Sequence, residues 1–97
     1  MTNYAAGAGE ITGEQISFGF TLSAAPTRGT TAADCPGTVA NPQAAPGKLC
    51  LYDRQRSTIG ASDPVVFNID KYGVDVEDHS AGAGIYYDIG VWAVTAP

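Results

Sequence analysis

Glycine and proline interrupt this chain so often that helices have little room. Twelve glycines and six prolines are spread over 97 residues. Nowhere do apolar residues recur at the three- and four-residue spacing of an amphipathic helix over a dozen positions. Apolar and polar residues alternate instead, in short runs bounded by turn-forming residues. We therefore expect an all-β fold, a compact antiparallel β-sandwich.

The alternating runs predict where the strands lie. Ile16–Leu22 alternates most strictly and would place Phe18 and Phe20 on one face. The polar residues Asp53–Thr58 would continue a strand that starts at Leu49 or lead out of it. Turn residues at Tyr72-Gly73 would join two runs into a hairpin. The expected strands are Ile16–Leu22, Leu49–Tyr52, Val65–Ile69, Val74–Glu77 and Ile85–Val94.

The last of these runs is the most apolar, and it is apolar on both sides. Such a strand is usually buried on both faces. In a two-layer sandwich of this size one face packs on the opposite sheet, so a subunit interface would cover the other. We expect six residues to form the core and part of this interface: Ile85, Tyr87, Ile89, Val91, Trp92 and Val94.

Cys35 and Cys50 are the only cysteines of the chain. With one histidine and no Cys-x-x-Cys motif, they are too few for a four-ligand zinc site, which leaves a disulfide or two buried thiols. The residues between them belong to a proline-rich stretch, Ala24–Lys48, that is unusually long for a loop without structure. A disulfide would tie this loop to the next strand, and it would indicate an oxidising destination.

The N-terminal residues 1–13, rich in Gly and Ala, predict a flexible arm that orders against a neighbour, followed by a single domain over 14–97. Met1 is expected to be the initiator. No apolar run near the N-terminus resembles a signal peptide, and none approaches the length of a membrane span.

The charge balance argues against nucleic acid and membrane insertion. Ten acidic residues outnumber five basic ones, giving a net charge of −5, and the basic residues are scattered along the chain. Nucleic acids require clustered Lys and Arg. Only 15% of the residues are charged, below the average of about 25% for globular proteins, which suits a surface covered by neighbours.

One dense polar cluster follows the expected hairpin: Asp75, Glu77, Asp78 and His79. Several carboxylates on one turn can ligate calcium or another metal. Alternation places Asp75 and Glu77 on one face of a strand and Asp78 and His79 in the loop that follows. The spacing matches no EF-hand loop. The alternative is a solvated strand edge, whose charges discourage aggregation. We favour this alternative and expect no bound metal.

Catalytic and cofactor motifs are missing from the sequence. There is no Gly-x-Ser-x-Gly nucleophile elbow and no phosphate-binding glycine loop. Sequence neighbours such as Asp78, His79 and Ser80 rarely adopt the geometry of a triad. We expect no enzymatic activity and no cofactor. The aromatic residues could form a binding face for carbohydrate or protein, but aromatics dominate small cores, so core and interface positions are favoured: Tyr4, Tyr52, Tyr72, Tyr86, Tyr87 and Trp92.

Several segments resemble the C-terminal globular head of collagen-like proteins of actinobacteria and of minor tail or fibre proteins of their phages. The similarity covers most of the chain and is most specific in Cys35-Pro-Gly-Thr38, Leu49-Cys-Leu-Tyr52 and the ending Gly90-Val-Trp-Ala-Val-Thr-Ala-Pro97. It is also carried by Ile16–Phe20 and by Asn41–Gly47. The resemblance implies a jelly-roll-like head that caps a stalk as a trimer, although no Gly-X-Y stalk precedes it in this sequence.

Together these features predict a non-enzymatic structural protein of a phage virion, a capsid decoration or tail-fibre head. Its expected partners are copies of itself, in a symmetric oligomer that the resemblance implies to be a trimer, and other virion proteins or a ligand on the host surface. The alternative is a recognition head of a secreted bacterial collagen-like surface protein. The two alternatives place the chain in a virion or on a cell surface, respectively.

Overall fold

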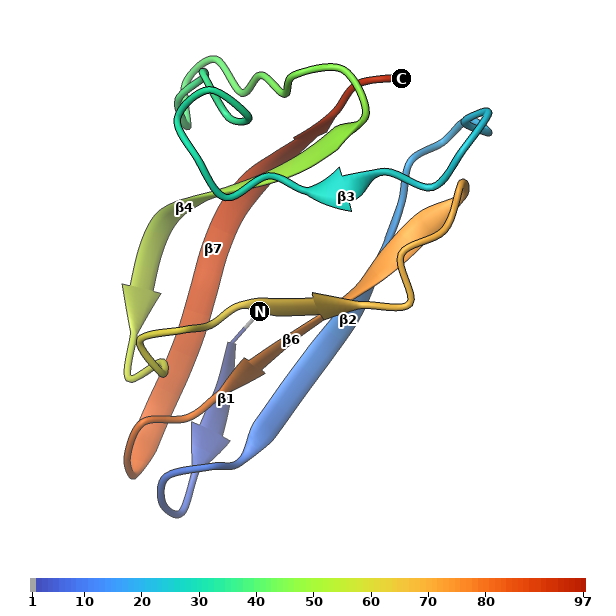
Figure 1. Cartoon of the computed structure of the whole chain (residues 1–97). Coiled ribbons are helices and arrows are strands. Elements are labelled where there is room, and N and C mark those ends of the chain that lie inside the picture. Colours follow the sequence, from blue (N-terminus) through green and yellow to red (C-terminus); the bar gives the residue numbers. More distant parts are fainter. Residues whose placement is uncertain (1) are drawn as a thin grey trace.

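The computed structural model describes residues 2–97, and their regular structure consists of seven strands. They form an elongated body with extents of 42 × 23 × 18 Å, and its longest strands run along its length (Figure 1). Met1 lies outside the described residues. No helix long enough and apolar enough to cross a membrane occurs in residues 2–97. The strands are β1 (Thr2–Ala5), β2 (Ile11–Ser17), β3 (Thr27–Arg28), β4 (Lys48–Ser57), β5 (Val65–Phe67), β6 (Gly73–His79) and β7 (Gly84–Val94).

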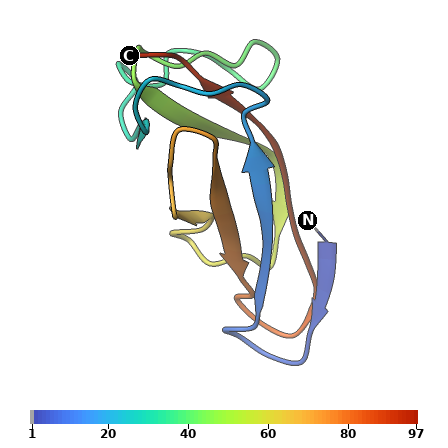
Figure 2. The ribbon, with the colours of Figure 1, turned by 90° about the vertical axis from the view of Figure 1, so that its right-hand side faces the viewer.

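The strands form two sheets that face each other as the layers of a sandwich (Figure 2). One sheet has four strands in the order β1-β7-β4-β3, and the other has three in the order β2-β6-β5. The expectation of an all-β sandwich is therefore confirmed. Its small core lies between the sheets, where the apolar sides of the alternating runs meet: Phe18, Leu22, Leu49, Val74 and Val76 are buried, and Ile16, Val66, Ile69, Trp92 and Val94 pack against them.

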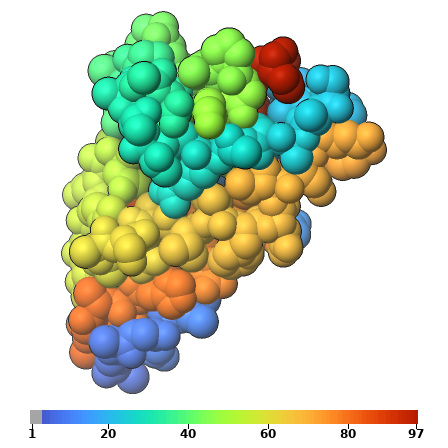
Figure 3. All heavy atoms as spheres, viewed as in Figure 1, coloured from blue at the N-terminus to red at the C-terminus, as the bar shows by residue number. Residues whose placement is uncertain are grey.

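The long proline-rich stretch connects two parallel strands. β3 pairs with the start of β4 in parallel, with Thr27 opposite Lys48 and Arg28 opposite Leu49. Parallel neighbours cannot be joined by a tight turn, because the chain must return to the end from which it started. Residues 29–47 make this connection, which we call the return loop, and they lie together at one end of the molecule (Figure 3). The expected Cys35–Cys50 disulfide is formed and fastens the return to β4.

The strand expected over Ile16–Leu22 lies elsewhere, and this prediction was wrong in position. β2 begins at Ile11 and ends at Ser17, because β6 supplies seven consecutive partners for this run, which includes the polar Thr12–Gln15. Gly19 adopts a φ of 78°, a conformation that ends the extended run. Phe18 and Leu22 still reach the core, whereas Phe20 is 55% exposed.

The expected boundary at residue 13 does not separate an arm from the sandwich. Thr2–Ala5 pair with β7 as β1, and the first residues of β2 pair with β6. Ala5 is fully buried. Glycine and alanine in this segment serve the turn between β1 and β2, where Gly9 has a φ of 86°.

The remaining strands agree with the sequence. β4 continues through the polar residues after Tyr52 as far as Ser57, with a bulge between Asp53 and Gln55. β5 and β6 form the expected antiparallel hairpin. β7, the last and most apolar strand, is central in its sheet, between β1 and β4.

Candidate functional site

The four-stranded sheet presents one side to the other sheet and one side away from it. We call the second side the outer face. The registers of β1, β7 and β4 place Tyr4 beside Ile85, Ser57 beside Tyr87, Gln55 beside Ile89 and Tyr52 beside Val91. None of these eight positions carries a charge, although the whole chain has a net charge of −5.

Half of the outer face is covered and half is open. Near the start of β4 the return loop is bonded to Tyr52 of this face, whereas the half nearer β1 carries exposed large side chains. There Tyr4 is 71%, Ile85 61% and Ile89 41% exposed. The amide of Gln55 donates a hydrogen bond of 3.0 Å to the Tyr87 hydroxyl across the strands. The open half is thus a mainly apolar surface, on which the Gln55 amide and the Tyr87 hydroxyl are held by a hydrogen bond to each other.

The expected core and interface residues divide by alternation. Trp92 and Val94 point inward and pack on the core, with the Trp92 ring 5.8 Å from that of Phe18. The others lie on the outer face, where Ile85 and Ile89 are exposed and Tyr87 and Val91 are half-buried. The tyrosines considered for a binding face are divided. Tyr86 is buried, and Tyr72 lies in the turn between β5 and β6 of the other sheet. Tyr4, Tyr52 and Tyr87 share the outer face.

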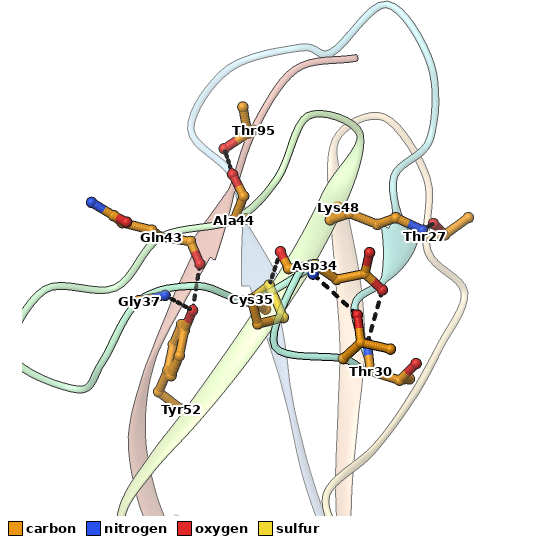
Figure 4. Close-up of a disulfide and its surroundings, with 12 residues drawn as sticks. Thr27, Thr30, Asp34, Cys35, Gly37, Gln43, Ala44, Lys48, Tyr52 and Thr95 are labelled. Atoms are coloured by element: carbon orange, nitrogen blue, oxygen red, sulfur yellow. Dashed lines mark hydrogen bonds between the residues drawn. A yellow bond between two sulfur atoms is a disulfide. The ribbon is translucent and has the colours of Figure 1, made fainter.

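Tyr52 holds the return loop against the outer face together with the disulfide (Figure 4). The backbone N–H of Gly37 donates to the Tyr52 hydroxyl at 3.0 Å, and this hydroxyl donates to the carbonyl of Gln43. On the opposite side the Thr95 hydroxyl donates to the carbonyl of Ala44 at 2.7 Å. Where the chain passes the disulfide, a Cβ on Gly29 would lie 2.5 Å from the Cys35 sulfur, so only glycine fits there.

Removal of the Tyr52 hydroxyl is expected to destabilise the protein by about 1 kcal/mol, because a Gly37 N–H and a Gln43 carbonyl lose one shared partner. The measurement is urea unfolding of Tyr52→Phe followed by Trp92 fluorescence. Tyr72→Phe is the matched control, since Tyr72 is 56% exposed. Equal stability of the two variants would show that the loop does not depend on this hydroxyl.

The four residues considered for a metal site do not converge on one point, and of the four Glu77 and His79 lie in contact at 3.0 Å. β6 extends to His79, so Asp78 and His79 lie in the strand and not in the loop expected after it. β2 causes this extension, because Thr12 pairs with Asp78 and Ile11 with His79. Asp75, Glu77 and His79 point away from the core, whereas Asp78 alternates with them and points inward. Within residues 2–97, no group of three His, Cys, Asp or Glu side chains is placed to hold a metal ion.

His79 fastens a loop to β6. Its Nδ1 lies 3.0 Å from Asp63 Oδ1, and its Nε2 lies 3.0 Å from Glu77 Oε1. Its backbone N–H also donates to Asp63 at 2.9 Å. The hydrogen bond to Asp63 raises the pKa of His79 above its usual value. A protonated ring can donate to both carboxylates at once.

Ser80, the other residue of the triad considered above, is held by backbone groups. Its hydroxyl donates to the carbonyl of Gly7 at 2.7 Å and accepts the N–H of Glu10 at 2.9 Å. These bonds fasten the turn between β1 and β2.

The sequence reasoning missed a pair of acids between the sheets. Asp78 on β6 is 1% exposed and Asp88 on β7 is 9% exposed, and the two are close enough to hydrogen-bond when one carries a proton. Burial raises the pKa of Asp78, and burial together with Asp53 and Asp78 raises the pKa of Asp88 to about 7. The sequence does contain a pattern that predicts this pair. Counting by twos along a strand, Asp78 falls on the same face as the buried Val74 and Val76, and Asp88 falls on the same face as Trp92.

The geometry defines a class of protein: a small β-sandwich with a disulfide-tied loop, an uncharged outer face and a buried pair of acids. No protein-family model, curated protein or solved structure matches the chain. The resemblance to collagen-like and phage fibre heads therefore rests on the residues quoted for it.

Proposed function

We propose that this chain is a non-enzymatic structural protein of a phage virion, a capsid decoration or tail-fibre head, whose copies associate through the outer face. The observation that carries the association is the open half of this face, where Tyr4 lies beside the exposed Ile85 and where Ile89 is exposed further along β7, with no charged residue paired to any of the three. Depletion of charge and enrichment of aromatic residues are typical of the centres of protein interfaces.

A second copy of the chain is the occupant that the charge distribution favours. Two copies with a net charge of −5 repel each other, and the repulsion and desolvation costs are smallest where neither copy presents a charged side chain. The outer face meets this condition. A closed symmetric oligomer would bury the same patch on every copy, and the resemblance to capping heads favours a trimer.

The virion assignment has separate support. The disulfide suits a particle that leaves the reducing cytoplasm. The resemblance to phage fibre heads names the kind of particle. Mass spectrometry of purified particles tests this assignment, and recovery of the chain from the host cell surface alone would favour the bacterial recognition head instead.

The association is tested by the effect of a charge on the outer face. Light scattering on a sizing column should give the wild type a mass that is a multiple of the 10.0 kDa chain. Ile85→Lys should shift it to the mass of one chain, because a buried lysine without a partner is too costly to keep. Reductant separates this effect from any disulfide between chains.

Ile11→Lys is the matched control. Ile11 is 58% exposed, close to the 61% of Ile85, but it lies on β2 in the other sheet. It should leave the mass of the oligomer unchanged. A wild type that stays at 10.0 kDa up to high concentration would contradict association through this face.

A further inference from the structure

A hollow of about 330 Å³ lies where the turn between β5 and β6 meets the end of β2 (Figure 1). Its volume falls at the lower end of the range of about 300–1,000 Å³ that is typical of sites for small molecules. The hollow belongs to the three-stranded sheet, so it is separate from the outer face of the other sheet. Six of its lining residues carry polar groups, and one of the six is aromatic: Gln15, Ser17, Asn68, Asp70, Tyr72 and Asp75.

Strand pairing places several of these groups together on the outward side of the sheet. Asp75 lies between two buried valines of β6, so its side chain points outward. Gln15 pairs with Asp75, and Ser17 pairs with Gly73. Paired residues share one side of the sheet. Gly73 carries no side chain, and a Cβ there would lie 2.3 Å from a backbone oxygen of β2, so the position beside Ser17 stays open.

The polar groups of the turn are held in place by hydrogen bonds. The Asn68 amide donates to Asp75 Oδ2 at 2.8 Å. Asp70 Oδ1 accepts the backbone N–H groups of Tyr72 at 2.7 Å and of Gly73 at 2.9 Å. Each carboxylate uses one oxygen in these bonds, and its second oxygen can accept from a ligand. Groups that are fixed before binding lose little freedom when a ligand arrives.

Tyr72 adds an apolar surface to this polar lining. It is 56% exposed. The ammonium group of Lys71 lies over its ring, 5.5 Å from the centroid, and leaves the opposite face of the ring for a ligand. A saccharide ring combines C–H groups, which pack on an aromatic ring, with hydroxyls that donate and accept hydrogen bonds.

We propose that this hollow binds an uncharged saccharide, whose ring stacks on Tyr72 and whose hydroxyls bond to the carboxylate of Asp75 and the amide of Gln15. Two carboxylates line the hollow, and within residues 2–97 no Lys, Arg or His does, which disfavours phosphates and acidic sugars. A carboxylate accepts from neighbouring hydroxyls, while an amide both donates and accepts. Such a site would supply the ligand on the host surface, and this link, unlike the site itself, rests on the proposed function.

The affinity for a short saccharide is expected to be weak, with a dissociation constant of about 1 mM, because the hollow is open to solvent. Two-dimensional amide NMR spectra of the whole chain, titrated separately with maltose, cellobiose, lactose and N,N′-diacetylchitobiose, measure it. At least one of these uncharged disaccharides should shift the resonances of Tyr72, Gly73 and Asp75 and saturate them. The anionic N-acetylneuraminic acid should leave them in place.

The variants locate the binding. Tyr72→Ala should weaken it about tenfold, because an aromatic contact surface is lost, whereas Tyr72→Phe should keep most of it. Tyr72→Ala should fold, since the side chain is exposed and the bond to Asp70 comes from the backbone. Tyr4→Ala is the matched control, because Tyr4 is 71% exposed but lies on β1 in the other sheet. It should bind as the wild type does.

Three outcomes would overturn the proposal: no saturable shift around Tyr72 with any of the four disaccharides, equal binding by the wild type and Tyr72→Ala, or a stronger response to N-acetylneuraminic acid. The test is independent of association through the outer face. Ile85→Lys should bind the saccharide as the wild type does, so either proposal can fail while the other stands.

Discussion

Replacement of both cysteines by alanine is expected to lower the free energy of unfolding by about 3 kcal/mol. The bond closes a loop with a sequence separation of 15 between its ends. Its main effect is on the unfolded chain, whose conformational freedom it restricts. In the folded protein the bond also holds the return loop on Cys50, which is fully buried. Urea unfolding of Cys35→Ala/Cys50→Ala, followed by Trp92 fluorescence, measures the loss.

Reductant supplies the internal control for this prediction. Dithiothreitol should lower the stability of the wild type toward that of the double variant and leave the double variant unchanged. If the double variant unfolds at the same urea concentration as the wild type, the Tyr52 and Thr95 hydrogen bonds alone hold the return loop.

Leu49→Ala is expected to cost about 3–4 kcal/mol, since a fully buried leucine leaves a cavity when it is truncated. Leu49 is 0% exposed and belongs to the core cluster together with Leu22 and Val74. It also pairs with Val94 at the end of β7. The expected cost lies in the middle of the usual range for a buried leucine.

Leu51→Ala is the matched control on the same strand and the same side of it. Leu51 is half-buried and lines an open cavity between the sheets, so its truncation removes less apolar area from contact. It should cost about half as much. Equal losses for the two variants would show that the core does not centre on Leu49.

These effects are large for a chain of this size. A domain of about 100 residues buries a modest share of its surface, and its total stability is usually about 5–15 kcal/mol. The disulfide supplements the small core directly. Association through the outer face, as proposed above, would supplement it further by covering apolar area that the core does not bury.

Much of the architecture follows from local patterns. Strict alternation and frequent turn residues predicted the β class, the hairpin of β5 and β6, and the whole of β7, because the side-chain period of a strand is two wherever one side is buried. The cysteine count left few options, and the disulfide is one of them. The division of Ile85, Ile89, Trp92 and Val94 between two faces also follows from alternation.

These local patterns did not predict the strands that form only because a neighbouring strand pairs with them. Thr12–Gln15 have no apolar alternation of their own, and they form a strand because β6 offers them hydrogen-bonding partners. In the same way β1 depends on β7 and the two-residue β3 depends on β4. The sequence predicted none of these three correctly.

The sequence by itself determined that this chain forms a β-sandwich whose last strand is apolar on both sides, and it reduced the two cysteines to a disulfide or a pair of buried thiols. Only the tertiary structure decided that the open half of the outer face holds Tyr4 beside Ile85, and that Asp78 meets Asp88 inside. The reason is that period and composition act along one strand, whereas the register between strands and the stacking of sheets bring together residues far apart in the chain. That stacking also brought two buried acids close enough to share a proton.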